Sequence, residues 1–162
     1  MQEREQKVYQ VLDELGIKYE VHQHPPVYTV EEAEKYWADI EGSHCKNLFL
    51  RNQKGKRHFL VILTQSKQVD FNKLSDQLGE KLSFASDKRL KKYLGLESGA
   101  VSAYGLINDV NNEVEVFLDK DLKNSEKINF HPNVNTATIT VDYKDFEKFL
   151  EWTGNDYSYI SI

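Results

Sequence analysis

Two strongly apolar segments separated by a short polar turn constrain the fold more than any other feature of this chain. Residues 45–52 and 57–64 are rich in Leu, Ile, Val and Phe, and the sequence QKGK lies at the turn between them. A turn around Gly55 suits a β-hairpin, and short apolar runs bounded by turn residues are typical of buried strands. We therefore predict that this hairpin lies at the centre of a sheet.

The remaining segments alternate between helical and strand patterns. Apolar spacing predicts a helix over residues 3–15, and capping residues predict helices that begin after Thr29, Asp70, Ser86 and Asp142. Alternation predicts strands over residues 17–22 and 114–118, and two strand pieces joined at Pro132-Asn133. Because hairpins outnumber βαβ units, we expect an α+β fold: one domain over residues 1–162, with a mixed, mostly antiparallel central sheet surrounded by helices.

The composition sets limits on location. The chain of 162 residues has a single cysteine, Cys45, which excludes an internal disulfide framework and suits a reducing cytosol. No run approaches the ~20 apolar residues of a membrane span. The first ten residues, MQEREQKVYQ, are charged from the start, so no signal peptide is visible. We expect a cytoplasmic monomer without membrane attachment.

Basic side chains are concentrated in the middle of an acidic chain. The formal net charge is −5, yet residues 41–92 hold 12 basic and 5 acidic side chains. The segment DKRLKKYLG alone contributes four basic residues, Lys88, Arg89, Lys91 and Lys92. Such a distribution predicts either a local surface that faces an anion or lysines scattered over solvated faces.

Residue patterns for several common chemistries are weak or absent. His22 and His24 could share a face of an extended segment, but no further Cys or carboxylate completes a metal site at a telling spacing. His44 and Cys45 are neighbours on a strand, so they point to opposite faces and form a poor base–nucleophile pair. The sequence contains no GxSxG, Walker or GxGxxG motif. We expect neither a metal nor a cofactor.

Three separated segments could together form a pocket. Lys46 places an amine at the start of an apolar strand, and His131 ends a strand before Pro132. Residues 95–106, GLESGAVSAYGL, contain three glycines and no helical period, which predicts a tight loop. A cation, backbone N–H groups and an imidazole suit an anionic or ester ligand. The alternative is that Lys46 reaches water and His131 is an ordinary turn residue.

Four blocks of the sequence resemble a known family. HPPVYTVEEAE, CKNLFLRNQKGKRHFLVIL, LGLESGAVSAYGLIND and FHPNVNTATITV are similar, in the same order, to the blocks of the YbaK-type, prolyl-tRNA synthetase-associated editing domains. They extend from about His24 to Val141, and the chain looks closest to the free-standing branch. The resemblance implies the fold of that family and hydrolysis of mischarged alanyl-tRNA(Pro) in trans, with the tRNA(Pro) acceptor end as partner and prolyl-tRNA synthetase as a transient one.

The resemblance also implies roles for single residues. It implies catalytic roles for Lys46, which lies near the tRNA 3′ end, for Gly99 of the loop that lines the aminoacyl site, and for His131, which helps to hold the aminoacyl-adenosine. It implies substrate binding by His24, Pro26, Thr29, Asn47, Ala100, Val101 and Asn135. No protein nucleophile and no metal is implied; a ribose hydroxyl of the substrate helps to activate the water. Contact of Lys88, Arg89, Lys91 and Lys92 with acceptor-stem phosphates is a hypothesis from charge alone.

The Gly-rich loop departs from the family pattern. This chain has Ser98 and Ala103 where the family commonly has proline, and Ala100 where it has serine. Fewer prolines loosen a loop that positions backbone groups, and a lost hydroxyl alters which amino acid fits. Three alternatives therefore stay open: a deacylase of cysteinyl-tRNA(Pro) or another small aminoacyl-tRNA, a catalytically inactive tRNA-binding module, and a general small-molecule-binding protein.

Overall fold

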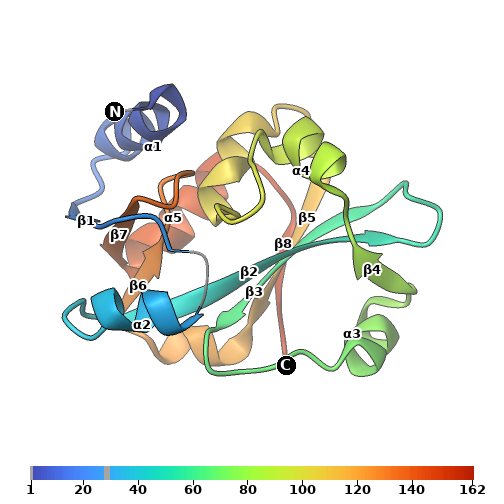
Figure 1. Ribbon diagram of the computed structural model, residues 1–162. Helices are drawn as coiled ribbons and strands as arrows, with labels where there is room; N and C mark the ends of the chain where they lie inside the picture. Colours follow the sequence, from blue (N-terminus) through green and yellow to red (C-terminus); the bar gives the residue numbers. More distant parts are fainter. Residues whose placement is uncertain (1, 28–29) are drawn as a thin grey trace.

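The computed structural model describes residues 2–27 and 30–162, which form one twisted sheet with helices around it (Figure 1). The sheet order is β1-β7-β6-β2-β3-β5-β8, and β4 pairs with β2 beside this path. The strands are β1 Tyr19–Gln23, β2 Ser43–Asn52, β3 His58–Thr64, β4 Leu82–Phe84, β5 Val114–Asp119, β6 Lys127–Phe130, β7 Ala137–Asp142 and β8 Tyr157–Ile160. Of the seven pairings among the described residues, β6–β2, β3–β5 and β5–β8 are parallel and the other four antiparallel, so the predicted mixed, mostly antiparallel sheet is confirmed.

The predicted central hairpin is confirmed. β2 and β3 pair from Cys45 opposite Thr64 to Arg51 opposite His58, and they lie in the middle of the sheet order. Gly55 turns the chain at a φ of 68°, and the Asn52 side-chain oxygen accepts hydrogen bonds from the backbone N–H groups of Lys56 and Arg57, just before β3. Alternation along β2 then divides its side chains between two hydrophobic clusters, one on each face of the hairpin.

The helices are α1 Glu3–Glu14, α2 Val30–Trp37, α3 Phe71–Leu78, α4 Asp87–Leu94 and α5 Tyr143–Thr153. The caps at Asp70 and Ser86 are confirmed, because each side chain accepts hydrogen bonds from the first turn of its helix. Asp142 is the N-cap residue of α5, but its side chain makes no capping hydrogen bond. The predicted cap at Thr29 lies outside the described residues. No helix in the described part of the chain is both long and apolar enough to cross a membrane.

The structure adds elements that the sequence patterns did not indicate. Two short 3₁₀ helices, η1 Ala103–Asn108 and η2 Lys120–Asn124, follow the Gly-rich loop and β5. The expectation of a loop throughout residues 95–106 is therefore wrong for its last four residues, because the Ser102 hydroxyl caps η1 by accepting a hydrogen bond from the Tyr104 N–H. β4 and β8 were also not predicted.

Candidate active site

A cavity that contains several of the predicted site residues lies at a gap in the sheet beside β2. β6 pairs with β2 only at Ser43 and His44, and β4 pairs with it only from Leu50 onward. The Phe49 carbonyl accepts from the Ala85 N–H, so the odd-numbered residues of β2 direct their backbone groups to this side. The backbone of Cys45 and Asn47 therefore faces an edge that no strand covers among the described residues.

The cavity at this gap measures about 310 Å³ and gathers residues from distant parts of the chain. Lys46, Asn47, Gly99, Val101 and His131 all line it, so the three segments singled out in the sequence do meet in space. The rest of its lining comes from the segment around α2, from β2 and from the end of β3: Val27, Ala33, Trp37, Cys45, Leu48 and Gln65.

Lys46 is the cation of the cavity. Its side chain leaves β2 on the same face as Leu48, and its Nζ donates a hydrogen bond to the Lys67 carbonyl at 2.5 Å. Lys67 is itself held by Asp119, whose carboxylate is buried and lies 2.7 Å from the Lys67 Nζ, and by Asp121. The Lys46 amine is thus held by an uncharged carbonyl. Its positive charge has no carboxylate partner among the described residues and is available to an anionic ligand.

His131 is a neutral imidazole, and one of its nitrogens has no hydrogen-bond partner among the described residues. Its Nδ1 lies 2.9 Å from the Ala137 carbonyl, which can only accept, so Nδ1 carries the proton. Burial lowers the pKa of His131 below its usual value, and the nearby His24 adds to this. The Nε2 atom is left with a lone pair that can accept a hydrogen bond from a hydroxyl or an amine.

A buried serine joins the Gly-rich loop to the His131 turn. The Ser102 hydroxyl donates to the His131 carbonyl at 2.6 Å, and Ser102 is fully buried. Asn133, which has a φ of 63° in the same turn, donates from its side chain to the Tyr104 carbonyl. These two contacts fix the relative position of the loop and the imidazole.

Gly99 needs its glycine for backbone conformation and not for lack of space. Its φ is 90°, and an added Cβ would meet no atom of the described residues within 4 Å. The Ala100 N–H is used within the loop, where it donates to the Glu97 carbonyl. No such bond is formed by the N–H groups of Gly99 and Val101 with the described residues, so these two are the donors available to a ligand oxygen.

The other polar side chains around the cavity provide neither an activated nucleophile nor a metal site among the described residues. Burial raises the pKa of the Cys45 thiol, so it stays protonated and is a poor nucleophile. His44 stacks on Trp37 with ring centroids 4.6 Å apart, and burial lowers its pKa. The Asn47 Oδ1 atom is buried without a hydrogen-bond partner among the described residues, which suits a donor brought by a ligand. Within the same part of the chain no three His, Cys, Asp or Glu residues are close enough to hold a metal.

Of the remaining predicted substrate residues, those that the structure describes do not line the cavity. His24 faces His131 edge-on at 6.3 Å, but its ring nitrogens are engaged with Pro25 and Thr138. Ala100 is buried, whereas Pro26 is exposed and Asn135 half-buried, and none of the three is among the residues that form the cavity wall. Thr29 is outside the described residues.

The four basic residues of α4 differ in their availability. Lys88, Lys91 and Lys92 are exposed. The Arg89 guanidinium instead donates to the Gly55 carbonyl at 2.9 Å and to the His58 Nε2 at 3.0 Å, which ties α4 to the hairpin turn. Three lysines and not four basic residues are therefore free to meet phosphates.

Sequence reasoning missed the contribution of α2. Ala33 and Trp37 line the cavity, and their spacing of four residues places both on one face of the helix. That spacing was the available signal, but it does not reveal which part of the sheet the face covers.

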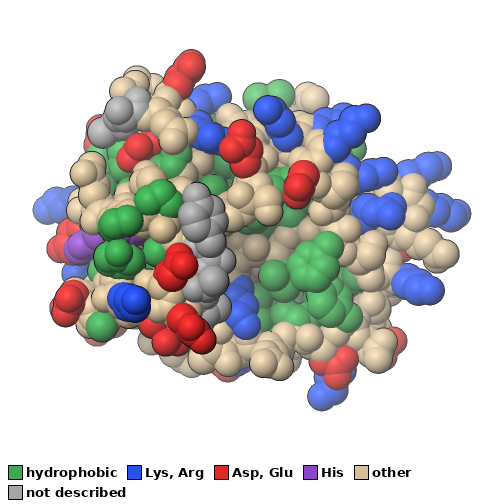
Figure 2. Space-filling model, in the orientation of Figure 1, with side chains coloured by type: hydrophobic (Ala, Val, Ile, Leu, Met, Phe, Trp, Pro, Cys, Tyr) green, Lys and Arg blue, Asp and Glu red, His purple; other side chains and the backbone are tan. Residues whose placement is uncertain are grey.

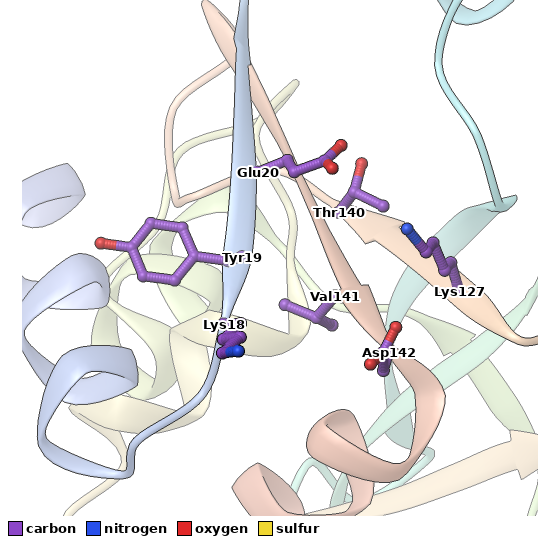
Figure 3. Close-up of a pocket in the computed structure, with 7 residues that line it drawn as sticks. All are labelled: Lys18, Tyr19, Glu20, Lys127, Thr140, Val141 and Asp142. Atoms are coloured by element: carbon purple, nitrogen blue, oxygen red, sulfur yellow. The ribbon is translucent and has the colours of Figure 1, made fainter.

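A second hollow, of about 240 Å³, lies between β1, β7 and the start of β6 (Figure 3). Its lining includes two amines and two carboxylates, so it offers no excess charge to an anion, and it contains none of the predicted site residues. Its lining residues are Lys18, Tyr19, Glu20, Lys127, Thr140, Val141 and Asp142.

Comparisons with known proteins agree on one family. The family model described as the aminoacyl-tRNA editing domain matches residues 24–149. The prolyl-tRNA editing protein ProX of Acetoanaerobium sticklandii is 46% identical over 160 residues, covering 97% of this chain and 96% of its own. The prolyl-tRNA synthetase associated domain-containing protein 1 of Mus musculus is 35% identical over 152 residues, which are 91% of this chain and 89% of the mouse protein.

A solved structure supports the fold independently. The crystal structure of a proposed trans-editing enzyme for prolyl-tRNA synthetase superposes with a TM-score of 0.75 at 20% identity, covering 100% of this chain and 99% of the other. At that identity the likeness concerns the architecture alone.

Proposed function

The chain belongs to the aminoacyl-tRNA editing domain family and is a hydrolase of mischarged tRNA, and on that premise we propose that its substrate is alanyl-tRNA(Pro). The observation that carries the proposal is the cavity that unites Lys46, the Gly99 loop and His131. Residues 1–162 act in this proposal as one editing domain. Its partner is the acceptor end of tRNA(Pro), with prolyl-tRNA synthetase as a transient companion, and the monomer meets both in the cytoplasm.

In the proposed reaction, water attacks the ester carbonyl carbon that joins the amino acid to the terminal ribose. Negative charge develops on the carbonyl oxygen, and the free N–H groups of Gly99 and Val101 stabilise it. The carbon–oxygen ester bond then breaks, the ribose oxygen takes up a proton, and the free amino acid leaves. The neighbouring ribose hydroxyl activates the water, which fits a cavity whose only thiol is kept protonated by burial.

Lys46 and His131 place the substrate. Lys46 exchanges the Lys67 carbonyl for a phosphate of the terminal nucleotide, because an ion pair with a phosphate is the stronger interaction. His131 accepts a hydrogen bond at Nε2 from a hydroxyl of the terminal ribose. Fixing the nucleotide at two points holds the ester next to the loop donors, and such positioning supplies a large share of catalysis.

The preference for alanine is proposed from the size of the cavity. Its wall includes Val27 and Trp37, whose bulk in this proposal excludes large side chains. Steric exclusion works against larger amino acids but not against smaller ones, so cysteine, which is close in size to alanine, is the competing substrate. Ala100 stands where the family commonly has serine, and its buried side chain removes one hydroxyl from the loop.

The test is release of labelled amino acid from alanyl-, cysteinyl- and prolyl-tRNA(Pro). The proposal expects rapid release of alanine, slower release of cysteine and none of proline. Faster release of cysteine would replace the substrate. No release from any ester, with tRNA still bound, would support a catalytically inactive binding module, and no binding of tRNA(Pro) in a gel shift would favour a small-molecule-binding protein.

A further inference from the structure

An apolar shelf lies beside the cavity and has no partner in the described chain. It consists of Leu48 and Phe71, which pack against the second hydrophobic cluster, and of Phe84, which contacts Phe71. Figure 2 shows hydrophobic side chains gathered next to the hollow, on the side where Figure 1 draws β4 and α3. Phe84 is 60% exposed, which is a large exposed fraction for an aromatic ring. Phe71 holds it edge-to-face, with ring centroids 5.4 Å apart.

The shelf continues directly from the cavity. Lys46, Leu48 and Leu50 alternate along one face of β2, and Leu48 belongs both to the cavity wall and to the cluster under the shelf. Phe84 pairs with Leu50 across β2 and β4, so the two side chains lie on the same face. At about 3.3 Å per residue, Phe84 lies about 13 Å from Lys46 along the strand.

The chain leads from the shelf to the basic helix. Phe84 precedes the α4 cap Ser86 by two residues, and α4 carries the exposed lysines. The basic helix therefore adjoins both the shelf and the cavity along the chain, because Gly99 of the cavity wall follows its last residue, Leu94, by five positions. A charged tRNA presents an esterified terminal nucleotide, unpaired nucleotides before it and a negatively charged duplex stem, and cavity, shelf and basic helix offer these parts a cationic pocket, an apolar surface and a basic surface.

We propose that Phe84 is a stacking platform for an unpaired base of the substrate, upstream of the terminal adenosine. The proposal rests on the proposed function and adds a binding subsite to it. An exposed ring beside a cationic cavity is the combination that binds single-stranded nucleic acid, because every base has a π-face and the cation holds the backbone. Phe71 fixes the ring in place, so little side-chain freedom is lost on binding.

The test compares four variants in steady-state deacylation. Phe84→Tyr keeps the ring, whereas Phe84→Leu and Phe84→Ala remove it; Trp152→Leu removes an exposed ring outside the cavity as the matched control. Stacking predicts that KM rises about tenfold in the Leu and Ala variants, with a smaller change in kcat, while the Tyr variant and the control stay near wild type. Recovery of wild-type KM by Phe84→Leu would overturn the proposal, because only apolar packing would then be needed.

A modified substrate makes the test specific for the base. Removal of the base from the nucleotide next to the terminal adenosine, or from the one before it, is expected to raise KM for the wild type but not further for Phe84→Ala. Full additivity of the two changes at both nucleotides contradicts stacking. A Phe84 variant that alters only the oligomeric mass would also overturn it, in favour of a contact between copies. Should the wild type release no amino acid, the proposed function fails on its own, and the Kd values of the same variants for uncharged tRNA still test the shelf.

Discussion

Replacement of Gly99 by alanine separates the positioning of the loop from the stability of the fold. Gly99 has a φ of 90°, and its missing Cβ would enter open space, so the cost of Gly99→Ala comes from backbone conformation and not from collision. We expect that cost to be about 1 kcal/mol of unfolding free energy, which lowers Tm by about 2–4 °C in a chain of this size. A typical domain retains most of its stability after such a loss and stays folded at the assay temperature.

Activity should suffer far more than stability. If Gly99→Ala relaxes toward a negative φ, the N–H groups of Gly99 and Val101 turn away from the ester carbonyl. Loss of one such donor lowers kcat by about 100-fold or more. The measurement is kcat for release of alanine from alanyl-tRNA(Pro), together with a thermal unfolding curve of the same preparation.

Gly16→Ala provides a matched control. Gly16 follows α1 with a φ of 70°, and its Cβ also would meet no described atom within 4 Å. Its substitution should cost the same stability and leave kcat unchanged. Equal activity of the Gly99→Ala and Gly16→Ala enzymes would refute the role of the loop donors.

Three further outcomes follow from the structure. Burial lowers the pKa of His58 to about 4, whereas the unfolded chain has a value of 6.5. The free energy of unfolding should therefore be highest above pH 6.5 and fall by about 3 kcal/mol as the pH drops to about 4, because only the unfolded state binds the proton in that range. This pH dependence should flatten in His58→Gln. Cys45→Ala should retain most of the wild-type kcat, whereas an inactive variant would indicate a covalent mechanism. The third variant combines Lys88→Ala, Lys91→Ala and Lys92→Ala. It should lower the slope of log KM against log salt concentration by about 0.9 for each phosphate that it no longer neutralises. An unchanged slope would be the contrary result.

Much of the fold follows from local chemistry that the sequence displays. The hairpin of β2 and β3 and the caps at Asp70 and Ser86 depend on residues a few positions apart, and all three were predictable. β4 has three residues and β8 has four, so each is too short for its side-chain pattern to mark a strand. Both depend on pairing with distant strands, which a local pattern cannot indicate.

Some members of the candidate site were predictable from the sequence, but its construction was not. Local patterns left Lys46 and His131 open between a pocket and ordinary surface roles, and only the family resemblance selected them together. The gap beside β2 arises where two unrelated pairings end, and the wall formed by Trp37 depends on how α2 docks. Arg89 illustrates the reverse error: its charge suggested phosphate binding, but a hydrogen bond to the distant Gly55 carbonyl occupies it.

The role of Lys46 in deacylation is tested most directly by single-turnover release of alanine from alanyl-tRNA(Pro), measured for the wild type and for Lys46→Ala. Lys54→Ala, which changes an exposed lysine of the hairpin turn, is the control. We expect rapid release by the wild type and the control, and release by Lys46→Ala close to the spontaneous rate of the ester. Lys46→Ala that is folded and as fast as the wild type would contradict it.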